Sequence, residues 1–484
     1  MAKLIIEKGN TVKELHFTPP EPLSKLLEDA GFREFRPCGG RGSCGKCAVE
    51  LWGKVSAPNS AESALGKRLS CQATVLGDAR VILPHIQDMS QIETGFRADI
   101  KLGKAMRGNI GAAVDIGTTT IALHRYDLRT GELLGQSAME NPQTNVAADV
   151  MGRIGAAMEG QLAKLSHQVK GALRQLLDEA GGPVDSMVIT GNTTMLYLLA
   201  GRDPACLSAY PFEADTLFGC DWLFDNTPVY LPPCMNAFVG ADITCAALSG
   251  EICSGETALL CDIGTNGELA LWKDGSLYVS STAAGPAFEG AGISCGCSSI
   301  PGAIDMVCTE NGGLKIHTID DASPVGLCGS GLIDAVAALL ELELMDETGA
   351  LDDDIEMAPG VVLLQKDIRA VQLAKAAIAA GIETLLQSSD TDYSQITRLY
   401  IAGGFGSHLN IASAAKIGLI PAQLTDRVEI LGNAALAGAA QILLDGEKLR
   451  QAEGIAASSR HMNLGGNPQF NENYMNAMLF PWEE

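Results

Sequence analysis

Two stretches of this chain are closely alike: AAVDIGTTTIALHRYD at residues 112–127 and ALLCDIGTNGELALWKD at residues 258–274. They align with Asp115 on Asp262, 147 residues apart. Each has an apolar strand, then Asp-Ile-Gly-Thr, then two small or polar residues and a second strand. A repeat at this domain-sized separation predicts that the same hairpin begins two halves of a duplicated domain.

The residue types of these hairpins suit phosphate binding. An Asp at the end of a buried strand can hold Mg²⁺, usually through water molecules. A Gly lets the turn approach an oxyanion, and the following Thr or Asn can donate hydrogen bonds to phosphate. The alternative is a tight turn with a capping Asp, but two copies favour a functional role. The predicted nucleotide-binding residues here are Asp115, Gly117, Thr118, Thr119, Thr120, Asp262, Gly264, Thr265, Asn266 and Gly267.

A third signal is the glycine-rich turn in RLYIAGGFGSHLN, residues 398–410. A predicted strand there runs into Gly403, Gly404 and Gly406. Glycine-rich turns are common, so this one is weak evidence by itself. A two-lobed kinase-like fold needs space for adenosine at such a turn, and we predict that these glycines provide it.

A different chemistry is indicated by the cysteines of RPCGGRGSCGKCAVE, residues 36–50. Their spacing is Cys38-x5-Cys44-x2-Cys47-x23-Cys71. Three thiolates on one loop and a fourth from a distant segment are typical of a [2Fe–2S] cluster, and the interleaved glycines let backbone N–H groups turn toward its sulfurs. A structural zinc site usually has two short Cys pairs. Zinc and unligated thiols therefore remain the weaker interpretations of these four cysteines.

Composition narrows the class of protein. The chain has 484 residues, 46% of them apolar and 54 of them Gly, which suits α/β layers with tight turns. The net charge of −24 should repel nucleic acid and anionic membranes. The sequence has no apolar run of about 18 residues, and Glu7 comes too early for a signal peptide. We therefore expect a cytoplasmic protein without a nucleic-acid or membrane partner, whose 14 cysteines serve in a reducing compartment.

Residues 1–88 resemble a ferredoxin domain with the β-grasp fold. KLIIEKGNTVKELHF predicts two alternating strands, SKLLEDAG (24–31) predicts a helix that ends at Gly31, and a strand should follow Cys47. The five-residue first gap resembles the adrenodoxin-like type. Residues 89–108 are mixed and polar, and we interpret them as a linker that lets the cluster domain move.

The remaining motifs together resemble the superfamily of actin, heat-shock ATPases and sugar kinases. The resemblance implies an ATPase domain over 109–484, with lobes of about 109–255 and 256–484. It implies a first phosphate loop at Asp115–Thr120, a second at Asp262–Gly267 and an adenosine loop at Ala402–Gly406.

Two further stretches fit this superfamily. FVGADITCAAL (238–248) resembles the helix in which an acidic or amide residue orients the attacking water or the metal, and Asp242 occupies that position. The alternative for Asp242 is a first-turn acid that complements the helix dipole. LGNAALAGAA (431–440) resembles the small-residue helix that packs the two lobes and acts as a hinge.

The combination of a [2Fe–2S] domain with this ATPase resembles the reductive activators of corrinoid proteins. The stretches that carry this resemblance are GNTTM (191–195), CDIGTNGELAL (261–271), AGPAFEGAGISCG (284–296), QKDIRAVQLAKAAI (365–378), YIAGGFGSHLN (400–410) and NPQFNENYMNAMLFP (467–481).

The expected fold is α/β with an α+β N-terminal domain: a β-grasp ferredoxin followed by a duplicated RNase H-like two-lobed ATPase. The resemblance implies a [2Fe–2S] cluster, ATP and Mg²⁺ as cofactors. It also implies a corrinoid protein of a methyltransferase system as partner, an external low-potential electron donor and a homodimer. The implied activity is ATP-dependent reduction of the Co(II) corrinoid to Co(I).

Other functions stay open at this stage. They are ATP-driven activation of a different low-potential redox enzyme, a small-molecule kinase with a redox sensor, and a chaperone-like binding module. The fused Cys38–Cys71 pattern argues against the first, and the roughly 50 residues after the hinge helix leave no room for a peptide-binding appendage. Cys295 and Cys297 are interpreted as inert small residues, with a redox pair or a second site as alternatives.

Overall fold

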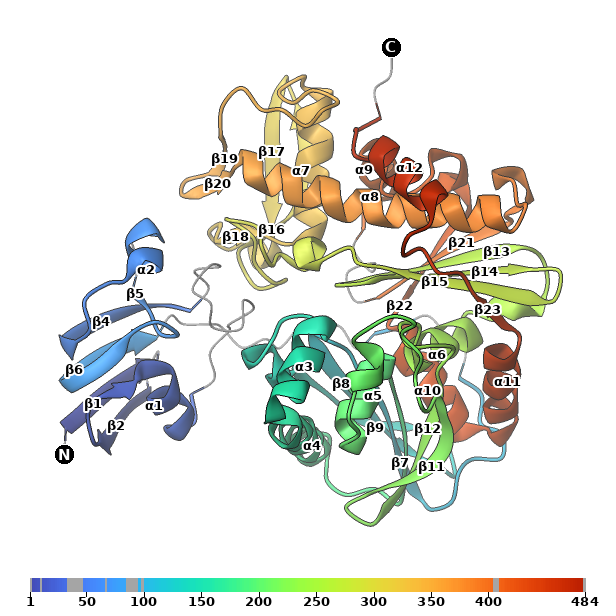
Figure 1. Cartoon of the computed structure of the whole chain (residues 1–484), viewed down its shortest axis with the longest axis horizontal. Helices are drawn as coiled ribbons and strands as arrows, with labels where there is room; N and C mark the ends of the chain where they lie inside the picture. The colour runs from blue at the N-terminus through green and yellow to red at the C-terminus, as the bar shows by residue number, and fades with distance from the viewer. Residues whose placement is uncertain are drawn as a thin grey trace. The chain divides into compact units, whose positions relative to one another are not determined.

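The structure is a computed structural model that describes residues 2–8, 11–32, 47–65, 68–83, 95–96, 100–403 and 409–481. The chain divides into two compact units, one of residues 1–90 with 142–156 and one of residues 91–141 with 157–484. Figure 1 labels the elements of both units.

The first unit contains a sheet with a helix packed on it. Its elements are β1 (Ala2–Lys8), β2 (Thr11–Phe17), β3 (Glu21–Pro22), α1 (Leu23–Asp29), β4 (Ala48–Val55), α2 (Ser60–Leu65), β5 (Arg68–Leu69), β6 (Thr74–Leu83) and α3 (Val150–Ala156). The strand order is β2-β1-β6-β4-β5, with β3 beside β6. β1 and β2 form an antiparallel hairpin, and β1 runs parallel to β6. The predicted hairpin strands, helix and strand after Cys47 are confirmed.

Alternating apolar residues bury one face of this sheet, because side chains two positions apart in a strand share a face. Gly31, directly after α1, has φ +82°, the left-handed conformation that glycine adopts easily at a helix end. The central buried side chains of this unit are Leu4, Ile6, Leu23, Leu26, Leu27, Val75 and Val81.

The second unit contains two six-stranded sheets. The first consists of β7 (Ile110–Ile116), β8 (Thr120–Asp127), β9 (Leu133–Glu140), β10 (Ser186–Gly191), β11 (Phe218–Phe224) and β12 (Thr227–Pro233). The second consists of β13 (Ala258–Ile263), β14 (Gly267–Lys273), β15 (Ser276–Thr282), β21 (Arg398–Ala402), β22 (Val428–Gly432) and β23 (Ser459–His461).

The two sheets share one arrangement over five strands. Their orders are β11-β12-β10-β7-β8-β9 and β22-β21-β13-β14-β15-β23. In each, three successive strands form an antiparallel meander. A fourth strand, β10 or β21, pairs in parallel with the first strand of the meander, and a fifth, β12 or β22, pairs in parallel with the fourth. The loop after the first strand of the meander therefore has the same setting in both lobes.

Helices and two small sheets complete this unit. The helices are α4 (Leu162–Glu179), α5 (Thr193–Ala200), α6 (Ala241–Ser249), α7 (Gly329–Glu341), α8 (Gln365–Ser388), α9 (Ile411–Lys416), α10 (Ala434–Leu444), α11 (Gly446–Ala457) and α12 (Pro468–Ala477). The small sheets are formed by β16 (Ala303–Glu310), β17 (Gly313–Thr318) and β18 (Gly326–Leu327), and by β19 (Ile355–Ala358) and β20 (Val361–Leu363). No helix that the structure describes has the length and apolar character needed to cross a membrane.

Helices α6 and α10 pack against each other between the two large sheets (Figure 1). Small residues allow this contact: a Cβ added at Gly438 would lie 2.1 Å from the carbonyl oxygen of Cys245. The hydroxyl of Ser249 donates to the carbonyl of Ala434 at 2.9 Å. The predicted packing of the 431–440 helix between the lobes is thus confirmed, because its backbone touches that of α6.

Part of the predicted linker is packed on the second unit. The N–H groups of Gly103 and Met106 donate to the carbonyls of Leu444 and Leu443, at 3.0 Å each. Ile100 also contacts the apolar core between the sheets. The predicted linker residues 89–94 and 97–99 lie outside the described residues. Residues 100–106 are therefore a bound segment of this unit.

Helix α8 has a buried stripe of apolar residues at three- and four-residue steps. Asp367, in its first turn, is buried and accepts from the N–H of Leu364 at 3.0 Å and of Ser294 at 2.8 Å. Phe480 is buried, so the tail packs on the body as far as the structure describes it. The buried residues of the stripe are Ile368, Val371, Ala374, Ile378, Ile382 and Leu385.

Candidate functional site

The first Asp-Ile-Gly-Thr loop joins β7 to β8. Asp115 is the penultimate residue of β7, Gly117, Thr118 and Thr119 form the turn, and Thr120 begins β8. The N–H of Gly117 donates to the carbonyl of Thr120 at 2.8 Å. A Cβ at Gly117 would lie 2.8 Å from that same oxygen, so the turn requires a glycine.

Two asparagines support this loop. The side chain of Asn192 donates to the Thr118 hydroxyl at 3.1 Å. Asn141 donates its side-chain amide to the Gly117 carbonyl at 2.8 Å and its backbone N–H to the Thr119 carbonyl at 2.7 Å. Neither asparagine was among the predicted site residues, although Asn192 lies in the GNTTM stretch.

The second loop joins β13 to β14 in the same way. Asp262 is the penultimate residue of β13, and Gly264, Thr265 and Asn266 form the turn. The N–H of Gly264 donates to the carbonyl of Asn266 at 3.1 Å. Gly267 begins β14, where a Cβ would lie 2.7 Å from the Thr282 hydroxyl.

Glu289 connects the two loops. It ends the short 3₁₀ turn Pro286–Glu289 of the second lobe. Its Oε2 accepts from the Thr119 hydroxyl at 2.5 Å, and its Oε1 accepts from the Thr265 hydroxyl at 2.9 Å. The two predicted phosphate loops therefore face each other closely enough for one carboxylate to span them. Glu289 was not predicted, although it lies in the AGPAFEGAGISCG stretch.

The predicted catalytic residue, Asp242, is the second residue of α6, and its side chain accepts from the N–H of Ile243 at 2.8 Å. Burial, together with the charge of Asp115, raises the pKa of Asp242 to about 7. Burial likewise raises the pKa of Asp262 to about 7, with the charges of Asp242 and Glu289 adding to the effect. The carboxylates from both loops and from α6 thus lie near one another.

Two more groups belong to this electrostatic cluster. Burial raises the pKa of Asp115 to about 7, with the amide of Asn433, which donates to Oδ2 at 3.1 Å, opposing the shift and the charge of Asp262 adding to it. Glu268 is paired with Asp262 across the second hairpin. Burial, followed by the charges of Asp242 and Asp262, raises the pKa of Glu268 well above its ordinary value. Glu268 was also missed from the sequence, because Ile121 occupies the aligned position in the first copy.

The cluster fits a cation that is held mainly through water. Four acidic side chains with raised pKa values would each be relieved by a nearby positive charge. Among the described residues, no group of three or more His, Cys, Asp or Glu side chains could hold a metal ion directly. Mg²⁺ usually keeps several water ligands and uses one or two carboxylates, which agrees with this spread arrangement.

Asn433 connects this cluster to the segment that precedes β7. Asn433 caps α10 by accepting from the N–H of Leu436 at 2.8 Å. Its own N–H donates to the carbonyl of Gly95 at 3.1 Å, and the neighbouring Gly432 pairs with Phe96 in an isolated antiparallel bridge. Asn433 thus contacts both the first phosphate loop, through Asp115, and the chain near residue 95.

Gly403 follows β21 with φ +93°. A Cβ there would lie 2.7 Å from Oδ1 of Asp262, so the predicted adenosine loop starts directly beside the second phosphate loop. Gly404 and Gly406 lie outside the described residues.

In the first unit, Cys47 lies just before β4 and Cys71 lies in the turn between β5 and β6. Their Sγ atoms are 3.1 Å apart. The neighbouring Cys71 sulfur and burial both raise the pKa of the Cys47 thiol. Two converging sulfurs fit a shared iron atom, which would stabilise the thiolates. Cys38 and Cys44, the other predicted ligands, lie outside the described residues.

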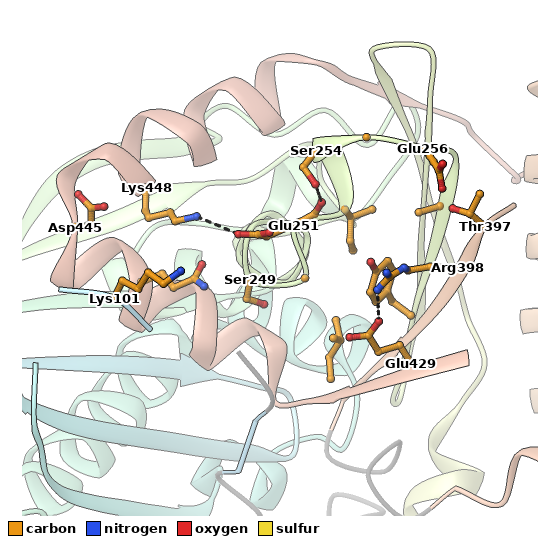
Figure 2. Close-up of a pocket in the computed structure, with 17 residues that line it drawn as sticks. Lys101, Ser249, Glu251, Ser254, Glu256, Thr397, Arg398, Glu429, Asp445 and Lys448 are labelled. Carbon is orange, nitrogen blue, oxygen red and sulfur yellow. Dashed lines mark hydrogen bonds and ion pairs between the residues drawn. The ribbon is translucent and has the colours of Figure 1, made fainter. Parts of the chain in front are cut away.

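Figure 2 shows a pocket of about 540 Å³ elsewhere in the second unit. It is lined by Ala258 and Arg398, which begin β13 and β21, whereas the candidate site follows the other ends of these strands. Arg398 is paired with Glu429 at 2.8 Å, and Lys448 lies 3.8 Å from Glu251. Because these cations are already engaged by acids, the pocket is a poor phosphate site.

Two sheets of matching order over five strands, each with an Asp-Ile-Gly-Thr loop facing the other, are the arrangement expected of a two-lobed nucleotide-binding protein. A family model described as the C-terminal ASKHA domain of RACo, the actin and sugar-kinase class, matches residues 256–484. A second model, described as the RACo middle region, matches residues 110–254.

Individual relatives agree with these matches. The chain is 34% identical to the corrinoid activation enzyme RamQ of Eubacterium limosum over 416 residues, 76% of this chain and 70% of that protein. It is 26% identical to a Co(II) methylated amine-specific corrinoid protein reductase of Methanosarcina barkeri, over 75% of this chain and 76% of that protein. A solved structure of a reductive activator for a corrinoid, iron-sulfur protein superposes with a TM-score of 0.71 at 26% identity, covering 99% of this chain and 98% of that one. The chain belongs to the RACo family, the reductive activators of corrinoid proteins.

Proposed function

We propose that this chain is an ATP-dependent reductive activator. It passes an electron from a [2Fe–2S] cluster in its N-terminal domain to the Co(II) form of a corrinoid protein in a methyltransferase system and restores Co(I). The observation that carries this proposal is that two Asp-Ile-Gly-Thr loops meet at Glu289 in a chain 34% identical to a corrinoid activation enzyme.

The proposed domain division is a β-grasp ferredoxin over 1–88, a linker, and an ATPase whose lobes are duplicated RNase H-like folds. The parallel pairing of β1 with β6 around the β1–β2 hairpin supports the first. The matching strand orders of the two large sheets support the duplicated lobes of the ATPase. The packed segment 100–106 argues for ending the linker before residue 100, earlier than residue 108.

In the proposed N-terminal site, Cys38, Cys44, Cys47 and Cys71 would hold the cluster. The 3.1 Å separation of the Cys47 and Cys71 sulfurs supports their part in it. When bound, a [2Fe–2S] cluster supplies one-electron transfer at low potential. The chain's own contribution is to keep the thiols together and to cover Cys47, which is buried.

In the proposed ATPase site, the hydroxyls of Thr118, Thr119 and Thr265 and the amide of Asn266 would donate to the phosphates. Gly403, with Gly404 and Gly406, would leave room for adenosine. Asp115 and Asp262 would hold water molecules around Mg²⁺, whose charge neutralises the carboxylate cluster. Asp242, whose charge interacts with those of Asp115 and Asp262, would orient the attacking water.

Coupling would proceed through the angle between the lobes. A ligand shifts a conformational equilibrium only by its different affinity for the two states. ATP that contacts both loops favours a closed arrangement, and hydrolysis removes that preference. The α6–α10 contact, where the backbones touch, is the proposed hinge.

The proposed partners are a corrinoid protein and an external low-potential donor, and the proposed assembly is a homodimer. Neither nucleic acid nor a membrane is expected to bind, given the net charge of −24.

The test is anaerobic spectroscopy of the reduced full chain mixed with a Co(II) corrinoid protein. Wild type and Cys308→Ala, which removes an exposed thiol outside the site, should form Co(I) only with Mg-ATP. Cys71→Ala should lose Co(I) formation and retain ATP hydrolysis. Absence of Co(I) with several corrinoid partners, despite an intact cluster and ATP turnover, would favour an activator of a different low-potential redox enzyme.

A further inference from the structure

Glu289 accepts hydrogen bonds from two threonine hydroxyls that a nucleotide phosphate would also need as donors. One of its carboxylate oxygens accepts from Thr119 in the first lobe and the other from Thr265 in the second. A Cβ at Gly264 would lie 3.6 Å from Oε1, so this oxygen also lies beside the glycine of the second loop. A single oxyanion thus bridges the two phosphate loops.

The backbone that carries Glu289 is held in place. Ala287 and Phe288, which precede it, are buried in the second lobe. The N–H of Gly285, at the start of this turn, donates to the carbonyl of Thr265 at 2.9 Å. A Cβ at Gly290 would lie 2.4 Å from the carbonyl oxygen of Cys297, so the chain is tightly packed there as well. Release of the carboxylate therefore has to come from side-chain rotation or from separation of the lobes.

A threonine hydroxyl has one hydrogen to donate. The hydroxyls of Thr119 and Thr265 cannot donate to Glu289 and to a phosphate oxygen at once. Carboxylate and phosphate are both anions, so their proximity is also unfavourable unless a cation lies between them. Donation of these two hydroxyls to phosphate and the Glu289 bridge therefore exclude each other.

We propose that Glu289 is a specificity-determining residue of the nucleotide site, whose carboxylate occupies the position of a nucleotide phosphate between Thr119 and Thr265. This inference rests on the proposed ATP-binding function. A ligand must bring phosphate, with its cation, to displace Glu289, and adenosine alone cannot do so. When the phosphate displaces Glu289, the nucleotide replaces the Glu289 carboxylate as the group that connects the two lobes.

The test is calorimetric binding of Mg-AMPPNP and of adenosine to the full chain with its cluster. In Glu289→Gln the competing charge is lost, and a hydrogen bond to a charged acceptor is about twice as strong as a neutral one. We expect Mg-AMPPNP to bind about tenfold more tightly, a change of about 1.4 kcal/mol, and adenosine to change less than about twofold. Glu289→Asp keeps the charge but is too short to span both loops, so it should tighten Mg-AMPPNP by about threefold.

The matched control is Glu310→Gln, which removes one charge from the same lobe at a position paired with Lys315 on the surface. It should leave both affinities as in wild type. Unchanged or weaker Mg-AMPPNP binding in both Glu289 variants would overturn the inference, as would an equal gain for adenosine, which indicates a generally opened cleft. Failure of the wild type to bind either ligand would reject the inference and the ATP site together. Tighter binding as expected without Co(I) formation would reject only the proposed client.

Discussion

The two phosphate loops have similar backbones and different polar surroundings. Around the first, neutral amides from Asn141, Asn192 and Asn433 contact the turn and Asp115. Around the second, Asp262 has the carboxylates of Asp242 and Glu289 as its charged neighbours. The repeat therefore specifies the shape of each loop, while residues from other elements decide its charge. Asp115 also has the charge of Asp262 nearby, but the amide of Asn433 offsets part of that effect, so we expect a cation to matter most at the second loop.

The strongest test of this difference compares Asp262→Asn with Asp115→Asn. Removing a group that stabilises charge in a transition state typically costs about 10²–10³-fold in turnover. We expect that loss for Asp262→Asn, because Asp262 lies where the cation is needed most. Asp115→Asn should lose about tenfold, since an amide can still pair with Asn433. The measurement is phosphate release at saturating Mg-ATP, and equal losses in the two variants would remove the proposed asymmetry.

The pH dependence of stability should show what the loops have in common, a cluster of carboxylates with raised pKa values. Asp115, Asp242 and Asp262 have pKa values of about 7 in the folded protein, against 3.8 ordinarily. The folded state therefore holds more protons than the unfolded state between about pH 4 and 7, and the free energy of unfolding falls as pH rises through that window. We expect a fall of about 2–4 kcal/mol without Mg²⁺, less than three independent shifts would give, because these groups are partly exposed and coupled.

Urea unfolding at pH 5 and pH 7.5, with and without Mg²⁺, measures this fall. Mg²⁺ should reduce it by stabilising the charged carboxylates. Asp262→Asn and Asp115→Asn should each flatten the profile, because both aspartates have pKa values of about 7 in the folded protein. A Mg-free stability that rises between these two pH values would contradict the predicted sign.

The smallest expected effect uses two substitutions beside the loop aspartates, with opposite outcomes for stability. Asn433→Ala leaves Asp115 without its amide donor and removes the cap of α10, so it should destabilise by about 1–3 kcal/mol. Glu268→Gln relieves repulsion beside Asp262 and should stabilise the Mg-free protein by about 1 kcal/mol near neutral pH. Thermal unfolding in chelator provides the comparison, and a shared sign would show that charge does not distinguish the two loops.

Local pattern was sufficient for much of the fold. The hairpins around Asp115 and Asp262, the buried stripe of α8 and the position of Asp242 at the start of α6 all follow from periodicity and spacing within one segment. The contacts of Glu289 could not be obtained in this way, because it reaches Thr119 across 170 positions of sequence. Its motif was visible, but its partners depend on how the lobes meet.

The predicted linker illustrates the same limit. Residues 100–106 have no clear period, yet their backbone pairs with the end of α10. A segment ordered by a distant helix shows no periodicity of its own.

The backbone contact of Gly95 connects the segment that precedes β7 to the first phosphate loop. Gly95 accepts from the N–H of Asn433, and a Cβ at Gly432 would lie 2.6 Å from that same Gly95 oxygen. The side chain of Asn433 in turn holds the carboxylate of Asp115. A shift of the backbone at Gly95 would therefore also move Gly432 and Asn433. Through the Asn433 amide, the same shift would reach Asp115 in the first phosphate loop.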